Sequence, residues 1–252
     1  MFNNHKKALV LLAGLALSQT AQADLVWSGT GNFGFTTANG DITESPQGGE
    51  FGYISTSGGV AQTGLGLGGE TDGSTMESSL FSVVAGDDLS FYFNFITSDG
   101  AGFADYAWVQ VLTAADDLVA TLFTARSTPS GDTVPGFGMP LPTAILNPTS
   151  TPIIANETDF NMLGGDSGSC YSGGCGNTGW IESTYTFLAD GSYKLLMGVT
   201  NWSDTAYDTA LVFDNISIND TPISPPPVGV PAPATGFLLA SLLGAIALRR
   251  RK

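Results

Sequence analysis

Histidine is almost absent from this chain of 252 residues, because the only one, His5, lies close to its start. From Asp24 onward there is no histidine at all. This excludes Ser-His-Asp and Cys-His catalysis from that part of the chain, and it removes the commonest protein ligand of zinc and copper. An enzyme would therefore have to work through pairs of carboxylates, as glycosidases and lyases do. No sequence motif surrounds the scattered glutamates, so we expect no enzyme and name no catalytic residue.

Basic residues are also scarce, with eight lysines and arginines against 23 acidic residues. Six of the eight lie near the two ends, and only Arg126 and Lys194 lie between them. The part of the chain between the terminal segments therefore carries a balance of −21. Such a surface repels phosphate backbones, so we expect no nucleic-acid partner. It also attracts cations and keeps an exported protein soluble.

Long apolar runs are missing too. The first short apolar run is typical of a signal peptide. His5, Lys6 and Lys7 form a positive start, and an apolar run of only ten residues follows at 8–17. Ten helical residues rise about 15 Å, which is half of a bilayer core. Ala21 and Ala23 then form a small-x-small cleavage site before Asp24. We predict a signal peptide over residues 1–23 and export by the general secretory route.

The end of the chain has the features of a short membrane anchor. Residues 236–248 carry no charge and are mostly apolar, and they are followed by a basic block formed by Arg249, Arg250, Arg251 and Lys252. A block of this kind resists translocation, so the main part of the chain is expected on the far side of the membrane. Upstream, residues 219–229 are rich in proline, which favours an extended spacer.

Residues 230–252 resemble the PEP-CTERM sorting signal. The resemblance lies in the motif of Val230, Pro231, Pro233, Ala234 and Thr235, followed by the apolar segment and the basic end. It implies transient anchoring in the inner membrane of a Gram-negative bacterium, processing by an exosortase-type enzyme, and a place at the cell surface or in a matrix of extracellular polysaccharide and biofilm. One residue departs from the family pattern, because an alanine lies between the two prolines where the family usually has glutamate. An ordinary C-terminal anchor is the alternative interpretation.

Residues 24–218 lack long helical patterns and predict one all-β body, an antiparallel β-sandwich of jelly-roll or carbohydrate-binding-module type. Apolar residues alternate in four segments, and the clearest is 89–96, where four apolar side chains share one face. In the last segment, Val212, Ile216 and Ile218 are expected on a common face. In all we expect nine or ten strands and no helix, with strands near 25–27, 52–55, 80–84, 89–96, 106–112, 119–123, 183–187, 193–199 and 210–218.

Two cysteines, Cys170 and Cys175, bracket four residues. In an exported chain this spacing predicts a small disulfide loop. Asp214 is the best single candidate for a structural calcium ion, because hard cations take carboxylate oxygens. The other reading of Asp214 is a residue that caps the strand ladder. We expect no other cofactor.

Three aromatic residues, Trp180, Trp202 and Tyr207, lie in or near expected loops. Aromatic rings beside polar groups stack on sugars, although core packing would account for each ring alone. These observations leave three hypotheses for the body. The first is a non-enzymatic protein of the cell surface or matrix, the second is a module that binds the cell's own polysaccharide, and the third is a carboxylate glycosidase or lyase.

Overall fold

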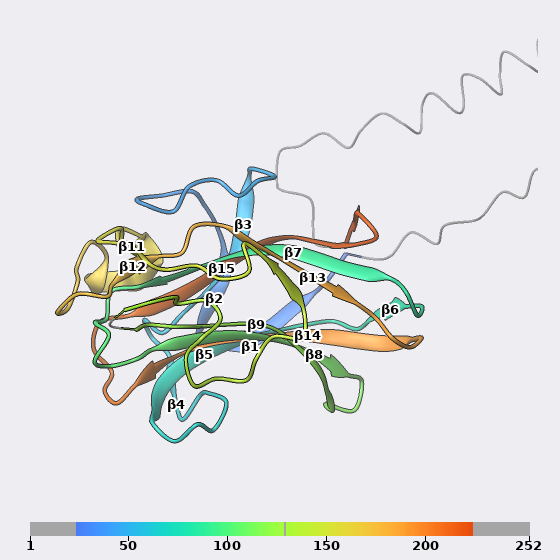
Figure 1. Ribbon diagram of the computed structural model, residues 1–252, viewed down its shortest axis with the longest axis horizontal. Coiled ribbons are helices and arrows are strands. Elements are labelled where there is room, and N and C mark those ends of the chain that lie inside the picture. Colours follow the sequence, from blue (N-terminus) through green and yellow to red (C-terminus); the bar gives the residue numbers. More distant parts are fainter. Residues whose placement is uncertain (1–23, 129, 224–252) are drawn as a thin grey trace, which may run out of the picture.

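The structure is a computed structural model that describes residues 24–128 and 130–223. Two antiparallel sheets lie one above the other (Figure 1), which confirms the expected antiparallel β-sandwich. The expected signal peptide at 1–23 and the sorting tail at 230–252 both lie outside the described residues. Within those residues, the structure contains no helix that is long and apolar enough to cross a membrane.

The first sheet has the strand order β1-β5-β14-β8-β9, and β4 and β6 pair with β5 and β14. Neighbouring strands of this order run antiparallel. Its strands are β1 (Trp27–Thr30), β4 (Val60–Ala61), β5 (Glu70–Ser78), β6 (Phe81–Val83), β8 (Tyr106–Thr113), β9 (Leu118–Arg126) and β14 (Gly191–Trp202).

The second sheet has the order β10-β13-β7-β15-β3-β2, to which three short strands are added. Two of them, β11 and β12, extend the end of β7, and β16 pairs with the end of β15. Its strands are β2 (Asn32–Thr37), β3 (Glu50–Ser55), β7 (Asp88–Thr97), β10 (Ile145–Asn147), β11 (Ile154–Ala155), β12 (Gly176–Asn177), β13 (Ile181–Thr186), β15 (Thr209–Ile218) and β16 (Thr221–Pro222). Through β16 the sandwich continues to the buried Ile223, past residue 218.

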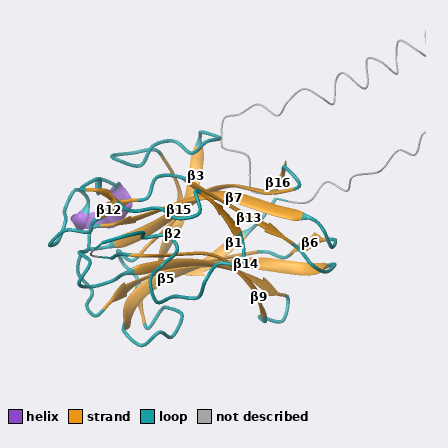
Figure 2. Cartoon of the chain, viewed as in Figure 1, coloured by secondary structure: helices purple, strands orange, loops and turns teal. Residues whose placement is uncertain are grey.

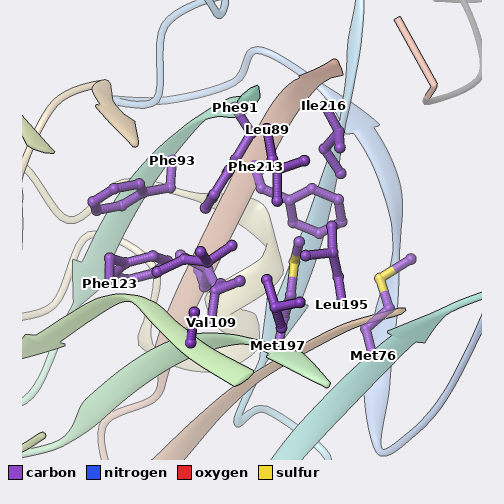
Figure 3. Packing of buried hydrophobic residues seen from close by; sticks show 14 of the residues in the cluster. Met76, Leu89, Phe91, Phe93, Val109, Phe123, Leu195, Met197, Phe213 and Ile216 are labelled. Carbon is purple, nitrogen blue, oxygen red and sulfur yellow. The ribbon is translucent and has the colours of Figure 1, made fainter. Parts of the chain in front are cut away.

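The main core fills the space between the two sheets (Figure 3). Phe93 of β7 stacks on Phe123 of β9 with ring centroids 3.7 Å apart, and both side chains are fully buried. On β14, Leu195 and Met197 face the same core. The alternation expected for 89–96, 106–112 and 193–199 is therefore confirmed: the apolar positions of these strands face inward.

The alternation expected for the last strand is wrong at one residue. Val212 packs on the outer face of the second sheet, whereas Ile216 and Ile218 lie in the core between the sheets. The register of β15 against β7 shifts between Asp214 and Ser217, and Asn215 adopts a left-handed φ of 55°. A bulge of this kind adds a residue to one strand, and this exchanges the faces of the residues that follow it.

Strand β5 lies between β1 and β14 in the first sheet, yet the sequence gives no sign of it. Its sequence, ETDGSTMES, holds a single large apolar residue, Met76, at an inward position. The neighbouring inward position is Ser74, whose hydroxyl donates to the carbonyl oxygen of Ser55 at 2.6 Å. A strand stabilised by such polar contacts has no apolar alternation, which is the signal on which a sequence-based prediction depends.

A 3-10 helix, η1 (Asn161–Asp166), is the one helical element within the described residues, although no helix was expected. It lies at the left end of the sandwich in Figure 2, at the side of the second sheet. Leu163 of this helix packs with Phe160, Ile42 and Phe51 over the outer face of that sheet. The segment around η1 therefore covers the second sheet close to the loops in which the candidate site lies.

Candidate functional site at the polar end

The inward side of several strands changes from apolar to polar at one end of the sandwich. Thr97 and Asp99 follow the phenylalanines of β7, Asp105 comes just before β8, Asn201 lies near the end of β14, and Thr209 begins β15. All five are buried, with exposed fractions of at most 1%. Because side chains alternate along a strand, these positions continue the inward-facing series. We call this group of five residues the polar end.

Asp105 joins the two sheets at the polar end. Its Oδ1 accepts a hydrogen bond of 2.8 Å from the backbone N–H of Trp202, and its Oδ2 accepts one of 2.6 Å from the hydroxyl of Thr209. That hydroxyl lies 2.7 Å from the hydroxyl of Thr97. Burial raises the pKa of Asp105 well above its usual value, because a charge is costly away from water. Asp105 therefore joins β14 of the first sheet to β15 of the second sheet through hydrogen bonds.

Asp99 is buried with only half of its carboxyl group bonded. The backbone N–H of Gly100 donates to its Oδ1 at 2.6 Å, whereas its Oδ2 has no hydrogen-bond partner within the protein. Burial and the nearby charges of Asp204 and Asp166 raise the pKa of Asp99 to about 7, against the effect of the Gly100 hydrogen bond. This carboxyl group is therefore held in an environment that disfavours its charge.

Asn201 has a similar half-bonded side chain. Its Nδ2 donates to Oδ1 of Asp72 at 3.1 Å, and its own Oδ1 is buried without a hydrogen-bond partner in the protein. The hydroxyl of Thr71 lies within hydrogen-bond distance of the carbonyl oxygens of both Asn201 and Asp204. The turn from Asn201 to Asp204 is thus fixed against β5, and it brings Asp204 toward the polar end.

Partly exposed carboxylates surround this buried group. The backbone N–H of Asp208 donates to Asp166 at 3.1 Å, and the hydroxyl of Thr56 donates to Asp208 at 2.9 Å. Burial, with a contribution from the charge of Asp166, raises the pKa of Asp208. Among the described residues the only ion pairs join Lys194 to Glu77 and Asp116, which lie elsewhere. No described lysine or arginine is therefore ion-paired with the acids around the polar end.

The disulfide predicted between Cys170 and Cys175 is present, and it closes a hairpin against the polar end. The N–H of Tyr171 donates to the carbonyl oxygen of Ser98 at 3.0 Å, and the N–H of Ala101 donates to that of Gly173 at 3.1 Å. These two bonds flank Asp99 in the sequence. A Cβ atom at Gly100 would lie 2.0 Å from the carbonyl oxygen of Tyr171, so only glycine allows this close approach.

The disulfide-closed loop 170–175, called the hairpin here, contributes Tyr171 to an aromatic cluster, which we define as Phe103, Tyr171 and Tyr207. The ring of Tyr171 lies 5.2 Å from that of Tyr207 and 5.5 Å from that of Phe103, measured between centroids. Tyr171 is 42% exposed, and Phe103 and Tyr207 are half-buried. The cluster thus presents aromatic surface to solvent next to Asp208, the neighbour of Tyr207 in the chain.

Of the three aromatic residues expected to contact a glycan, only Tyr207 belongs to this cluster. Trp180 packs edge-to-face on Phe51 with ring centroids 5.4 Å apart, on the outer face of the second sheet. Trp202 packs on the outer face of the first sheet, where the guanidinium group of Arg126 lies 4.2 Å from its ring centroid. The structure therefore places the three residues at separate sites.

Sequence reasoning missed Phe103 and Tyr171 as members of the site. The position of Tyr171 offered a signal, because an aromatic residue inside a short disulfide loop has no room to fold into the core. Phe103 offered none, since it lies in a loop whose path depends on the hairpin. Their meeting depends on loops that are far apart in the sequence.

Asp214, the expected calcium ligand, lies at the bulge of β15. Its Oδ2 accepts a hydrogen bond from the hydroxyl of Ser45, and burial raises its pKa. Across residues 24–128 and 130–223, no three Asp, Glu, His or Cys side chains form a group spaced to hold a metal ion. Asp214 therefore belongs to no such group of three within the described residues.

An open hollow of about 560 Å³ lies beside the polar end, and the glycine-rich loop at 64–69 forms part of its wall. Its wall includes Glu70, Thr71 and Ser203. Glu70 accepts hydrogen bonds from the backbone N–H groups of residues 67–69 and from the hydroxyl of Tyr106 at 2.6 Å. Burial opposes the charge of Glu70, but these donors outweigh it and lower the pKa of the carboxyl group to about 2. The carboxylate of Glu70 therefore holds the glycine-rich loop in place through hydrogen bonds to its backbone.

Comparison with known proteins identifies no family. No protein-family model matches the chain, and no curated protein matches it. Solved structures similar to it include the K1 cleaved adhesin domain of Lys-gingipain from Porphyromonas gingivalis W83, at 10% identity and a TM-score of 0.36, covering 77% of this chain and 89% of that one.

A second similar structure is described as "CBM4 structure and function", at 8% identity and a TM-score of 0.32, covering 77% of this chain and 93% of that one. A third is the enzymatically active domain of tailspike protein 4 of bacteriophage CBA120, at 7% identity and a TM-score of 0.31, covering 77% of this chain and 20% of that one. Likenesses at these scores say nothing about what this chain binds.

Proposed function

We propose that this chain is an exported, non-enzymatic protein of the cell surface or extracellular matrix, whose sandwich binds a glycan through the aromatic cluster. One observation carries the glycan proposal: an exposed tyrosine, Tyr171, lies on a disulfide-closed hairpin and packs against Tyr207 and Phe103. The flat faces of these rings suit the C–H surface of a sugar ring.

The groups around the cluster suit sugar hydroxyls. Asp204 and Asp208 are partly exposed, and their carboxylates are acceptors for hydroxyl donors. The hydroxyl of Thr71 donates to the main-chain carbonyl oxygen of Asp204, and the hydroxyl of Thr56 donates to the carboxylate of Asp208, so both residues are held in place. A rigid aromatic surface with a few fixed polar groups is the usual composition of a carbohydrate site, and its rigidity lowers the entropic cost of binding.

The burial of the polar end favours binding over hydrolysis. A glycosidase needs two carboxyl groups that reach the scissile bond from either side. Asp99 and Asp105 have the strongly raised pKa values that suit a general acid, but they are 1% and 0% exposed, so neither reaches a bound sugar. The partly exposed acids are left as hydrogen-bonding groups.

Replacement of Tyr171 by alanine tests the glycan proposal. We expect the protein to be retained on at least one neutral or acidic polysaccharide of a glycan array, and Tyr171→Ala to weaken that binding about tenfold or more, because one stacked ring is lost. Phe35→Ala is the matched control, since Phe35 is 46% exposed on the edge strand β2 and lies outside the cluster. No retention of the wild-type protein, or equal losses in both variants, would refute glycan binding at this cluster.

Export and sorting form the second part of the proposal. They are supported by the signal peptide predicted at 1–23, by the resemblance of 230–252 to the PEP-CTERM signal, and by a disulfide, which forms in oxidising compartments. Mass spectrometry of the protein from cells should find Asp24 at the N-terminus and no basic block at the C-terminus. A surface form that still ends at Lys252 would contradict processing by an exosortase-type enzyme.

A further inference from the structure

Two oxygen atoms at the polar end are buried without a donor. These are Oδ2 of Asp99 and Oδ1 of Asn201, in side chains that are 1% and 0% exposed. Buried polar atoms in folded proteins nearly always have a partner, so each exception calls for a ligand or a bound water. Oδ1 of Asn201 can only accept, and Oδ2 of Asp99 accepts whenever its carboxyl group is ionised, so a cation or a donor would satisfy both atoms.

The two side chains lie in the same small region. Asp105 links them. Its carboxyl group accepts a hydrogen bond from the N–H of Trp202, the residue next to Asn201, and the charge of nearby Asp99 contributes to the raised pKa of Asp105. The charge of Asp204 acts on both Asp99 and Asp105. Asn201 and Asp204 are in turn held by the same hydroxyl, that of Thr71. Hydrogen bonds from the N–H of Asp99 to Thr97, between Thr97 and Thr209, and from Thr209 and the N–H of Trp202 to Asp105 therefore join Asp99 to the segment that carries Asn201 and Asp204.

The charge of this region favours a cation over a neutral donor. Carboxyl groups gather here, and no described lysine or arginine forms an ion pair with them. Lys194 pairs with Glu77 and Asp116 away from this region, whereas Arg126 lies close enough to Asp105 for their charges to interact but forms no ion pair with Asp99 or Asp204. A bound cation would balance the negative charge of these carboxyl groups.

We propose that the polar end binds a calcium ion through Oδ2 of Asp99, Oδ1 of Asn201 and the carboxylate of Asp204. Calcium accepts a mixture of carboxylate, amide and carbonyl oxygens in a flexible shell, whereas magnesium requires a strict octahedron and zinc prefers nitrogen and sulfur. Two carboxylates and one amide make up this set, which agrees with the finding that no group of three acidic, histidine or cysteine side chains is spaced for a metal within the described residues. Main-chain carbonyl oxygens and water would fill the remaining positions.

The ion would also order the hairpin. Asp99 lies between Ser98 and Ala101, whose backbone groups hold the disulfide hairpin that carries Tyr171. Fixing Asp99 therefore fixes the strand end on which the aromatic cluster rests. The calcium site does not rest on the glycan proposal, because only Asp204 is shared with the groups around the aromatic cluster and calcium binding is measured without any glycan.

Calorimetric titration of the full-length protein with calcium, after removal of bound metal by a chelator, tests the site. We expect one calcium ion per chain. Asp99→Asn should lower the affinity about 100-fold and Asn201→Ala about tenfold, because each removes one ligand oxygen or its charge. The control is Asp190→Asn, which removes the same charge from the exposed turn between β13 and β14 and should leave the affinity unchanged. Asp214→Asn should also leave it unchanged, which separates this site from the one expected at the β15 bulge.

Terbium luminescence gives a second readout. Terbium replaces calcium at oxygen sites and is excited through nearby aromatic rings, here that of Trp202, so emission should appear in the wild-type protein and be lost in Asp99→Asn. Circular dichroism must show that each variant is folded, and Asn201→Ala carries the test if Asp99→Asn does not fold. Absence of calcium heat and terbium emission in the wild-type protein would assign the two oxygens to bound water and overturn the proposal. A folded Asp99→Asn variant with wild-type affinity would overturn it equally.

Discussion

The same strands build two different interiors along their length. In the middle of the sandwich β7 contributes Phe91 and Phe93 to a close-packed apolar core, and beyond Phe95 the same side of the chain contributes Thr97 and Asp99 to the polar end. The apolar part gains stability from the removal of hydrocarbon from water and needs no specific partners. The polar part must find a partner for every buried atom, and at two atoms the protein supplies none.

This difference separates the part that stabilises the fold from the part that is available for function. A buried ring is satisfied by any neighbour of the right shape, so the middle of the sandwich is complete by itself. A buried carboxyl group is satisfied only by donors or a cation, and an incomplete set of donors leaves a place for a ligand. The hairpin and the aromatic cluster lie at the incomplete end, where the hydroxyl of Ser98 donates to the carbonyl oxygen of Asp166 in η1.

The largest effect is expected from a cavity in the apolar middle. Phe93 is fully buried and stacks on Phe123 at 3.7 Å, so Phe93→Ala removes a whole ring from a packed site. The free energy of unfolding should fall by about 4 kcal/mol, from lost burial and from the cavity that remains. Urea denaturation followed by tryptophan fluorescence measures this loss.

Leu188→Ala is the control for that experiment, because Leu188 is 86% exposed and its truncation should change the free energy of unfolding by less than about 0.5 kcal/mol. If calcium binding persists in Phe93→Ala at a temperature where the protein is still folded, the two interiors are energetically separate. A loss of less than about 1 kcal/mol for Phe93→Ala would mean that the middle of the sandwich is not the main source of stability.

The apolar middle could be predicted from sequence because its signal is local. The alternation in 89–96 and 193–199 places the inward residues without knowledge of the partner strands. The prediction fails where the contact that decides the face is distant: Val212 faces outward because of a bulge against β7, and β5 is held by polar contacts such as that of Ser74. Neither the bulge of β15 nor the polar contacts of β5 can be recognised from the residues of that strand alone.

The polar end could have been predicted only in part. Extending the alternation of β7 beyond Phe95 leads to Thr97 and Asp99 on the inward side, and a buried acid at that point is an unusual residue. The sequence does not show that Asp105 and Asn201 arrive at the same place, because their meeting depends on the pairing of β8 with β14. For the same reason it could not join Tyr171 to Tyr207.

A smaller effect should distinguish a carboxylate rich in donors from one that lacks them. Asp99 has one donor and a raised pKa, whereas Glu70 accepts hydrogen bonds from the Tyr106 hydroxyl and backbone N–H groups such as that of Gly69, and these lower its pKa from 4.5 to about 2. A carboxyl group with a lowered pKa in the folded state contributes stability above its unfolded pKa and loses it as the pH falls. Glu70 should therefore stabilise the fold fully above about pH 4.5 and progressively less between pH 4.5 and pH 2.

Glu70→Gln removes this titration. At pH 7 the variant should be about 1 kcal/mol less stable than the wild-type protein, because an amide cannot accept from all of these donors while solvent screens the exposed part of the charge. The difference between the two proteins should shrink as the pH falls from 4.5 toward 2, since the wild-type carboxylate is then protonated as well. Thermal unfolding of both proteins at a series of pH values measures this difference, and the other carboxyl groups, present in both, cancel from it. A difference that stays constant over this range would show that the donors around Glu70 position the glycine-rich loop without stabilising a charge, and the contrast with Asp99 would then lie in burial alone.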